Sequence, residues 1–166
     1  MSITVRITHL LIAVVAVLGV AMVESERSAV RAAAERPDPQ DTQKKADGSR
    51  SVWDGVYTEE QAKRGNPLYQ QECANCHGSQ LNGGEAAPAL VGIEFGANWG
   101  GLSLGDLFDR IKMSMPQDNP GHLSRQQTAD ILVYMLSMNK IPAGQKELEP
   151  DAAALSRIRF EMFKPQ

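Results

Sequence analysis

The sequence predicts an all-α domain with long loops, and three observations lead to this fold class. Two stretches read as capping boxes, in which a hydroxyl at the N-cap and an amide three residues later satisfy exposed backbone donors: Thr58–Gln61 and Ser124–Gln127. Residues 103–112 repeat apolar side chains at helical spacing. No run of β-branched residues follows the apolar N-terminal segment, so strands are not predicted. We expect roughly three to five helices.

The first predicted helix starts after Thr58 and runs toward Cys73. Pro67 interrupts its pattern, because proline removes one backbone bond and disfavours the helical region for the preceding residue, Asn66. Two arrangements remain open. Either the helix kinks at residues 65–67, which we favour, or a second helix starts with Asn66 as its N-cap and Pro67 at its first position.

Two further helices are marked by their apolar residues. In residues 103–112 these occupy positions i, i+3, i+4 and i+7, and we expect them only to pack: Leu104, Leu107, Phe108 and Ile111. The helix that starts after Ser124 repeats the period in Ile131, Tyr134, Met135 and Met138. It ends at Asn139 and Pro142.

Two other stretches show weaker helical patterns than these three helices. The residues between Cys76 and Ser103 are rich in Gly, Ala and Pro, so we predict loops there. In residues 150–163, Leu155, Ile158 and Met162 lie at helical spacing. We interpret this tail as a short helix that packs on the domain.

The chain has only two cysteines, Cys73 and Cys76, and His77 directly follows the second. A zinc site needs four ligands, and the other histidines, His9 and His122, do not supply the spaced pair such a site requires. A thioredoxin-type redox pair needs a βαβ pattern, which is absent. The pattern C-x-x-C-H is instead typical of a covalent haem c site, with both cysteines as thioethers and His77 as an iron ligand.

The N-terminal segment fits the export that haem attachment requires. Residues 10–23 form an uninterrupted apolar run of 14 residues after Arg6 and His9. That length suits a signal peptide, here residues 1–23, better than a membrane span of about 20 residues. Cleavage is expected after Ala21 or at residues 32–34, with an uncleaved membrane anchor as the alternative. We therefore expect a periplasmic protein.

The rest of the chain divides by composition. Residues 24–51 contain no aromatic residue and are mostly charged, small or proline, so we interpret them as a flexible linker. All nine aromatic residues lie from Trp53 onward. We therefore place the folded domain at residues 52–142, followed by a C-terminal extension at residues 143–166.

The residues from Trp53 to Ile141 resemble a class I, mono-haem cytochrome c, which implies the cytochrome c fold around one haem. In that family a glycine and an aromatic four residues apart in the N-terminal helix cross an aromatic of the C-terminal helix; Gly65, Tyr69 and Tyr134 match. The stretches SVWDGVYTEEQAKRG, FGANWGGLSL and MPQDNPGHLS resemble periplasmic cytochromes associated with dehydrogenases, including quinoprotein ones. Pro67 departs from the family pattern.

The resemblance also implies roles for two loop residues. Pro88 matches a family proline whose carbonyl accepts a hydrogen bond from the ligating histidine, here His77, and so fixes its tautomer. Trp99 resembles a tryptophan that hydrogen-bonds a haem propionate, and a role as an ordinary core aromatic is the alternative.

The sixth iron ligand in this family is a methionine after the middle helix, and Met115 is our assignment. Pro116 keeps Met115 out of the helical region, so that an extended backbone presents its sulfur. Met113 lies on the last helical turn and is expected to pack. His122 is the other alternative, in a Pro/Gly loop.

An iron with two protein ligands has no free position for substrate, so we expect an electron-transfer protein and no enzyme. It would carry single electrons between a dehydrogenase or other respiratory donor and a terminal acceptor, such as an oxidase or another cytochrome. The alternatives are a fixed subunit of a dehydrogenase or oxidase complex, and a haem sensor or peroxidase with a displaceable methionine.

Charge constrains the partners further. Residues 52–166 carry 14 acidic and 10 basic side chains, so no basic stripe for nucleic acid is present. Only five of the basic residues are lysines. We therefore expect redox partners to dock through mainly apolar or weakly electrostatic contacts, and membrane contact only if the N-terminal segment stays uncleaved.

Overall fold

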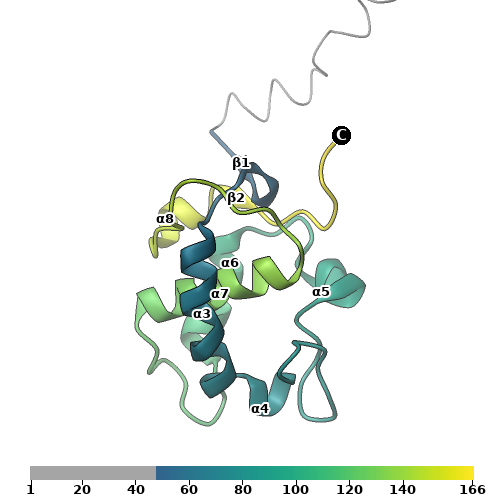
Figure 1. Cartoon of the computed structure of the whole chain (residues 1–166), viewed down its shortest axis with the longest axis vertical. Helices are drawn as coiled ribbons and strands as arrows, with labels where there is room; N and C mark the ends of the chain where they lie inside the picture. The colour runs from purple at the N-terminus through teal and green to yellow at the C-terminus, as the bar shows by residue number, and fades with distance from the viewer. Residues whose placement is uncertain (1–47) are drawn as a thin grey trace, which may run out of the picture. The chain divides into compact units, whose positions relative to one another are not determined.

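The computed structural model describes residues 48–166, so the expected signal peptide and most of the expected linker lie outside the described residues. In this range the chain forms six α-helices, one 3-10 helix and two short strands (Figure 1). They are β1 (Arg50–Ser51), η1 (Val52–Asp54), α3 (Glu59–Glu72), α4 (Ala74–His77), α5 (Gly92–Trp99), α6 (Leu104–Ser114), α7 (Arg125–Met138), α8 (Ala152–Leu155) and β2 (Ile158–Arg159). The all-α class is confirmed, with more helices than predicted. None of the helices in residues 48–166 has the length and apolar character that a membrane crossing requires.

Helices α3 and α7 cross closely, as the resemblance implied. A Cβ added to Gly65 would lie 1.9 Å from the backbone oxygen of Asp130, so only glycine permits this approach. The rings of Tyr69 and Tyr134 meet beside it, with centroids 5.3 Å apart. This crossing makes α3 and α7 the central pair of the domain.

Helix α3 is continuous through Pro67, so the alternative in which a second helix begins at Asn66 is wrong. Pro67 lies on the exposed side of the helix. On the other side, Gln61, Gly65 and Tyr69 are buried at intervals of four residues. We attribute the continuity to this packed face, which offsets the one backbone bond that proline removes.

Helix α5 corrects the prediction that the whole stretch from Cys76 to Ser103 is loop. Its glycine and alanine content gave no local indication of a helix, and tertiary contacts hold it. Phe95 is fully buried and meets Phe160 edge to face, with ring centroids 5.5 Å apart. Gly96 lies directly beneath Met162. Packing against the C-terminal tail therefore decides the conformation of α5.

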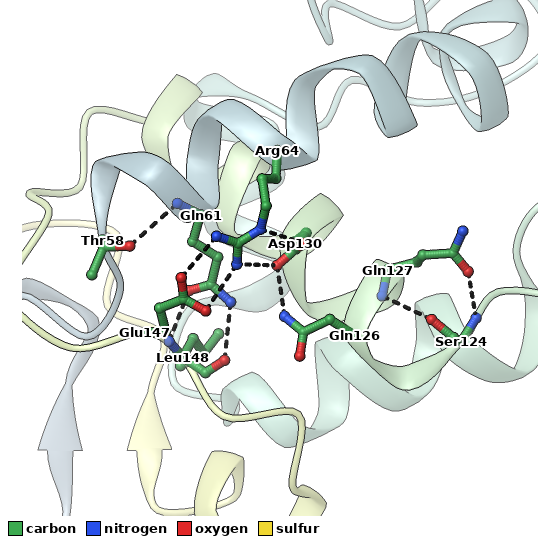
Figure 2. Close-up of polar contacts among 9 residues, drawn as sticks. All are labelled: Thr58, Gln61, Arg64, Ser124, Gln126, Gln127, Asp130, Glu147 and Leu148. Atoms are coloured by element: carbon green, nitrogen blue, oxygen red, sulfur yellow. Dashed lines mark hydrogen bonds and ion pairs between the residues drawn. The ribbon is translucent and has the colours of Figure 1, made fainter.

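We call residues 143–163 the C-terminal strap, because they contact α3 through Leu148 and contact α6 through α8 and β2. Figure 2 shows how the strap is fastened to α3. The buried amide of Gln61 donates to the backbone oxygen of Leu148 at 3.0 Å and accepts from its N–H at 2.8 Å. The guanidinium of Arg64 pairs with both carboxylate oxygens of Glu147, each at 2.8 Å.

The pairing of the strap with the start of the folded unit corrects two predictions. The expected short helix is limited to α8, and Ile158 lies instead in β2, which pairs in parallel with β1. Ser51, which we had assigned to the linker, is buried and caps η1, so the folded unit includes β1. No local sequence pattern predicts a pairing between two strands that are so distant in the sequence. The β1–β2 pair lies at the opposite end of this unit from α4 (Figure 1).

Candidate cofactor-binding site

The two cysteines and His77 lie at the junction of α3 and α4. Cys73 ends α3 and begins α4, and its carbonyl accepts from the N–H groups of Cys76 and His77 at 3.2 and 3.0 Å. The chain therefore makes one tight turn across the motif. Both thiols are free, with Cys76 exposed and Cys73 half-buried. Burial, aided by Glu72 and Cys76, raises the pKa of Cys73 to about 11, so this thiol is neutral at ordinary pH.

The orientation of His77 is set by one hydrogen bond. Its Nδ1 lies 2.8 Å from the carbonyl oxygen of Pro88, which is the bond that the resemblance implied. A carbonyl oxygen only accepts, so Nδ1 carries a proton, and in the neutral ring the lone pair is then on Nε2. The His77 ring is thus in the tautomer that a metal ligand needs.

The loop after the motif folds back tightly to bring Pro88 to His77. The N–H of Gly83 donates to the carbonyl of His77 at 2.8 Å, and Leu90 donates to Leu81 at 2.7 Å. Gly83 has a φ of +72°, and a Cβ there would lie 2.5 Å from the nitrogen of Ala89. Sequence analysis did not single out Gly83, although the Gly-rich composition of the loop was visible.

Met115 ends α6 in an extended conformation, with φ −125° and ψ 148°, as Pro116 predicted. Its side chain is half-buried and packs against the core. Met113 behaves differently: its side chain is 72% exposed, so the expectation that it packs is wrong. It therefore faces outward on the last turn of α6.

His122 forms a bridge that sequence analysis did not anticipate. Its Nε2 lies 3.0 Å from a carboxylate oxygen of Glu72, at the end of α3. Its Nδ1 lies 2.8 Å from the carbonyl oxygen of Asn119 in its own loop. Both ring nitrogens are therefore used by protein partners in this arrangement.

Trp99 ends α5 and is half-buried, packed against the core. Its ring centroid is 6.4 Å from that of Phe95, which supports a packing role. Within residues 48–166 its indole N–H donates to no protein acceptor, whereas that of Trp53 donates to the carbonyl of Glu161 at 2.9 Å. The Trp99 N–H thus remains available for a ligand oxygen.

The donor set fits a haem c better than a bare metal ion. It consists of two uncrosslinked thiols one turn apart, an imidazole with a lone pair on Nε2, and a thioether in an extended segment. Across the part of the chain that the structure describes, no cluster of three or more His, Cys, Asp or Glu residues is arranged to hold a metal ion. Leu68, Leu90 and Met138 add half-buried apolar surface on the core.

Comparison with known families agrees with this geometry. The family model for cytochrome c oxidase, cbb3-type, subunit III matches residues 60–135, a span that runs from α3 to α7 and contains the motif, Pro88 and Met115. The chain contains a c-type cytochrome domain. Its cytochrome domain binds haem c and serves electron transfer, as that family does.

Other comparisons are more distant. The cytochrome is similar to the crystal structure of the sulfane dehydrogenase SoxCD from Paracoccus pantotrophus, with 21% sequence identity and a TM-score of 0.47. The match covers 64% of this chain and 61% of that one, so the cytochrome spans about three fifths of the chain it matches. No curated protein matches the sequence significantly.

Proposed function

We propose that the cytochrome carries single electrons in the periplasm, from a dehydrogenase or other respiratory donor to a terminal acceptor. Three features support this. The domain is a c-type cytochrome. His77 and Met115 would supply two ligands to an iron. The N-terminal segment has the charge and apolar pattern of an export signal.

Four side chains would hold the cofactor. Cys73 and Cys76 would form the thioether bonds, and His77 and Met115 would provide the nitrogen and sulfur ligands. Haem c supplies the one-electron chemistry of its iron when bound. The Trp99 N–H would donate to a propionate oxygen. The protein holds these groups in position, so that little has to rearrange when an electron arrives.

The observation that carries the proposal is the hydrogen bond from His77 Nδ1 to the carbonyl of Pro88. It leaves Nε2 as the free donor atom and raises the basicity of the imidazole. A histidine that served only in packing would need no such fixed tautomer. The acceptor is a backbone carbonyl in a loop folded around Gly83. The backbone conformation of that loop therefore sets the orientation of the His77 ring.

Met115 decides between an electron carrier and a haem sensor or peroxidase. With a thioether bound, the iron has no open position for a diatomic ligand, and its reduction potential is raised. With the position open, carbon monoxide or peroxide would bind. The extended backbone at Met115 and its half-buried side chain favour the carrier.

The test is to replace the two neighbouring methionines separately in the holo-protein. We expect Met115→Ala to abolish the sulfur-to-iron charge-transfer band of the ferric form and to let the ferrous form bind carbon monoxide. Met113→Ala is the matched control, because this exposed side chain lies two residues away, and it should leave the spectrum unchanged. The reverse pattern would overturn the assignment of Met115.

Two further measurements test the rest of the proposal. The mass of the exported protein, taken with its visible spectrum, reports how many haems are attached and whether the N-terminal segment is cleaved. Isolation from native membranes or periplasm distinguishes a free carrier from a fixed subunit of a dehydrogenase or oxidase. A mass equal to the polypeptide alone, without a Soret band, would refute haem attachment.

A further inference from the structure

Asn139, the half-buried residue at which α7 ends, uses its side-chain amide in three hydrogen bonds. Its Nδ2 donates to the carbonyl oxygens of Leu90 and Met135, each at 2.9 Å, and its Oδ1 accepts from the N–H of Gly92 at 3.1 Å. Only the bond to Met135 lies within the end of α7. The other two reach 49 and 47 residues back along the chain, to the segment that joins the Pro88 loop to α5.

The partners of the Asn139 amide fix its orientation. Two carbonyl oxygens lie on its Nδ2 side, and a carbonyl oxygen only accepts. The N–H of Gly92 lies on its Oδ1 side and only donates. Ending α7 would engage only carbonyls of that helix, so the two bonds to Leu90 and Gly92 indicate that Asn139 has a second role.

Leu90 is held on both of its backbone groups, and it lies two residues after Pro88. Its N–H donates at 2.7 Å to the carbonyl of Leu81, a fully buried residue, and its carbonyl accepts from Asn139. Before Pro88, the N–H of Gly84 donates to the carbonyl of Ala87 at 2.9 Å. The exposed Pro88, whose carbonyl orients His77, is thus held between a turn and an anchor that depends on Asn139.

The same amide also caps the start of α5. The N-cap residue of α5 is Val91, which has no side-chain oxygen and makes no capping bond. Asn139 Oδ1 instead accepts from the N–H of Gly92, the first residue of α5. One side chain at the end of α7 therefore fixes both the loop that carries Pro88 and the start of the helix that ends at Trp99.

We propose that Asn139 is a positioning residue for His77: its amide clamps residues 90–92 to the end of α7 and so holds the Pro88 carbonyl against His77 Nδ1. The proposal rests on His77 being an iron ligand, as in the proposed function. A firm hydrogen bond to Nδ1 makes the imidazole a stronger donor, which favours ferric iron and lowers the reduction potential. Release of the clamp weakens this bond and raises the potential.

The first experiment follows hydrogen exchange into D2O by NMR in the ferrous holo-protein. It is made under carbon monoxide, so that the iron is low-spin and diamagnetic whether or not Met115 is bound. We expect the His77 Nδ1–H and the Leu90 N–H to exchange about tenfold faster in Asn139→Ala than in the parent, which is about 1.4 kcal/mol in the free energy of opening the loop. The buried Leu132 N–H, in the middle of α7, reports unfolding of the whole domain and should rise by less.

Two further variants make this test specific. Asn139→Asp has nearly the same size and keeps an acceptor for Gly92, but at pH 7 it loses both donated bonds, so it should exchange as fast as Asn139→Ala. Ser137→Ala is the matched control, because the Ser137 hydroxyl donates at 2.7 Å to the carbonyl of Tyr134 at the same helix end without touching the loop. It should keep the parent rates. Parent rates in Asn139→Asp, or an equal rise in Ser137→Ala, would overturn the proposal.

The reduction potential tests whether the clamp acts on the iron. Asn139→Ala leaves the net charge unchanged, so a higher potential in this variant would come from the weakened His77 bond, and Ser137→Ala should keep the parent value. Faster exchange with an unchanged potential would overturn the positioning role.

Failure of this inference and failure of the proposed function give different results. A normal haem spectrum with equal exchange rates in the parent and Asn139→Ala would defeat the clamp alone. A parent without a Soret band would defeat the proposed function, and the difference in Leu90 exchange between the two proteins would still decide the clamp.

Discussion

His77 and Pro88 are 11 residues apart, and the bond between them was predicted from the resemblance. The residue that makes the bond possible was not. Gly83 adopts a left-handed φ and lies against the backbone of Pro88 and Ala89. In the sequence it is one of several glycines in a loop, because nothing local distinguishes a glycine that a close contact requires from one that only adds flexibility.

Gly83→Ala should therefore destabilise the domain and disturb His77. An alanine there would have to adopt φ +72° and place its Cβ 2.5 Å from a backbone nitrogen. We expect the free energy of unfolding to fall by about 2 kcal/mol, with a changed haem spectrum. The measurement is urea unfolding of the holo-protein.

The neighbouring Gly84 provides the control. A Cβ on Gly84 meets nothing within 4 Å, so Gly84→Ala should stay within about 0.5 kcal/mol of the parent. Equal effects of the two substitutions would show that the close contact at Gly83 has no energetic role.

At the scale of elements, α3, α6 and α7 were predictable because each begins with a capping residue and buries a periodic face. Helix α5 was not, because its packing partner Phe160 lies far along the chain. The continuity of α3 through Pro67 depends in the same way on α7. Local preference decides where helices start, and contacts between helices decide which weak ones persist.

Gly65→Ala tests the crossing of α3 and α7. Alanine favours a helix over glycine by about 1 kcal/mol, which would stabilise α3 in isolation. Here the added Cβ would lie 1.9 Å from the Asp130 carbonyl oxygen, so the two backbones must separate. We expect a net loss of at least about 2 kcal/mol in the free energy of unfolding, measured with urea.

Lys63→Ala, on the exposed side of the same helix, is the control and should stay within about 0.5 kcal/mol. A stabilising Gly65→Ala would mean that the helices are not in close contact.

At the scale of the whole molecule, the C-terminal strap joins α3, α6 and β1 into one unit. Its attachment is partly ionic: the Arg64 guanidinium lowers the pKa of Glu147 below its usual range through paired hydrogen bonds. Because the pKa of this carboxyl group is lower in the folded state, the ion pair stabilises the fold at pH values above the unfolded-state pKa of Glu147. That stabilisation is lost as pH falls through the acidic range.

Glu147→Gln should therefore reduce stability at neutral pH and have no effect at about pH 2.5, where the carboxyl group is protonated in both the folded and the unfolded state. Both side chains are nearly half exposed, so solvent screening limits the loss at pH 7 to about 0.5–1 kcal/mol. Urea unfolding at the two pH values gives the difference. Glu149→Gln, exposed and two residues away, should show no such dependence; a matching pH profile in that variant would assign the effect to general charge.

Docking of redox partners is also a property of the whole surface. The domain carries five lysines, and four large apolar side chains are exposed among the described residues: Ile93, Leu102, Met113 and Phe163. We expect the rate of electron transfer from the physiological donor to change by less than about threefold between low and high salt. Stopped-flow kinetics at several ionic strengths measure it, and a steep fall would indicate electrostatic docking.

The sequence by itself determined the cofactor chemistry and the main helices, because C-x-x-C-H, the N-caps Thr58 and Ser124 and Pro116 act through residues a few positions apart. Only the tertiary structure decided the conformation of α5, the pairing of β1 with β2, the contact at Gly83 and the bridge from His122 to Glu72. Each of these depends on groups brought together from distant parts of the chain. The spacing of residues along the sequence does not predict which distant groups come into contact.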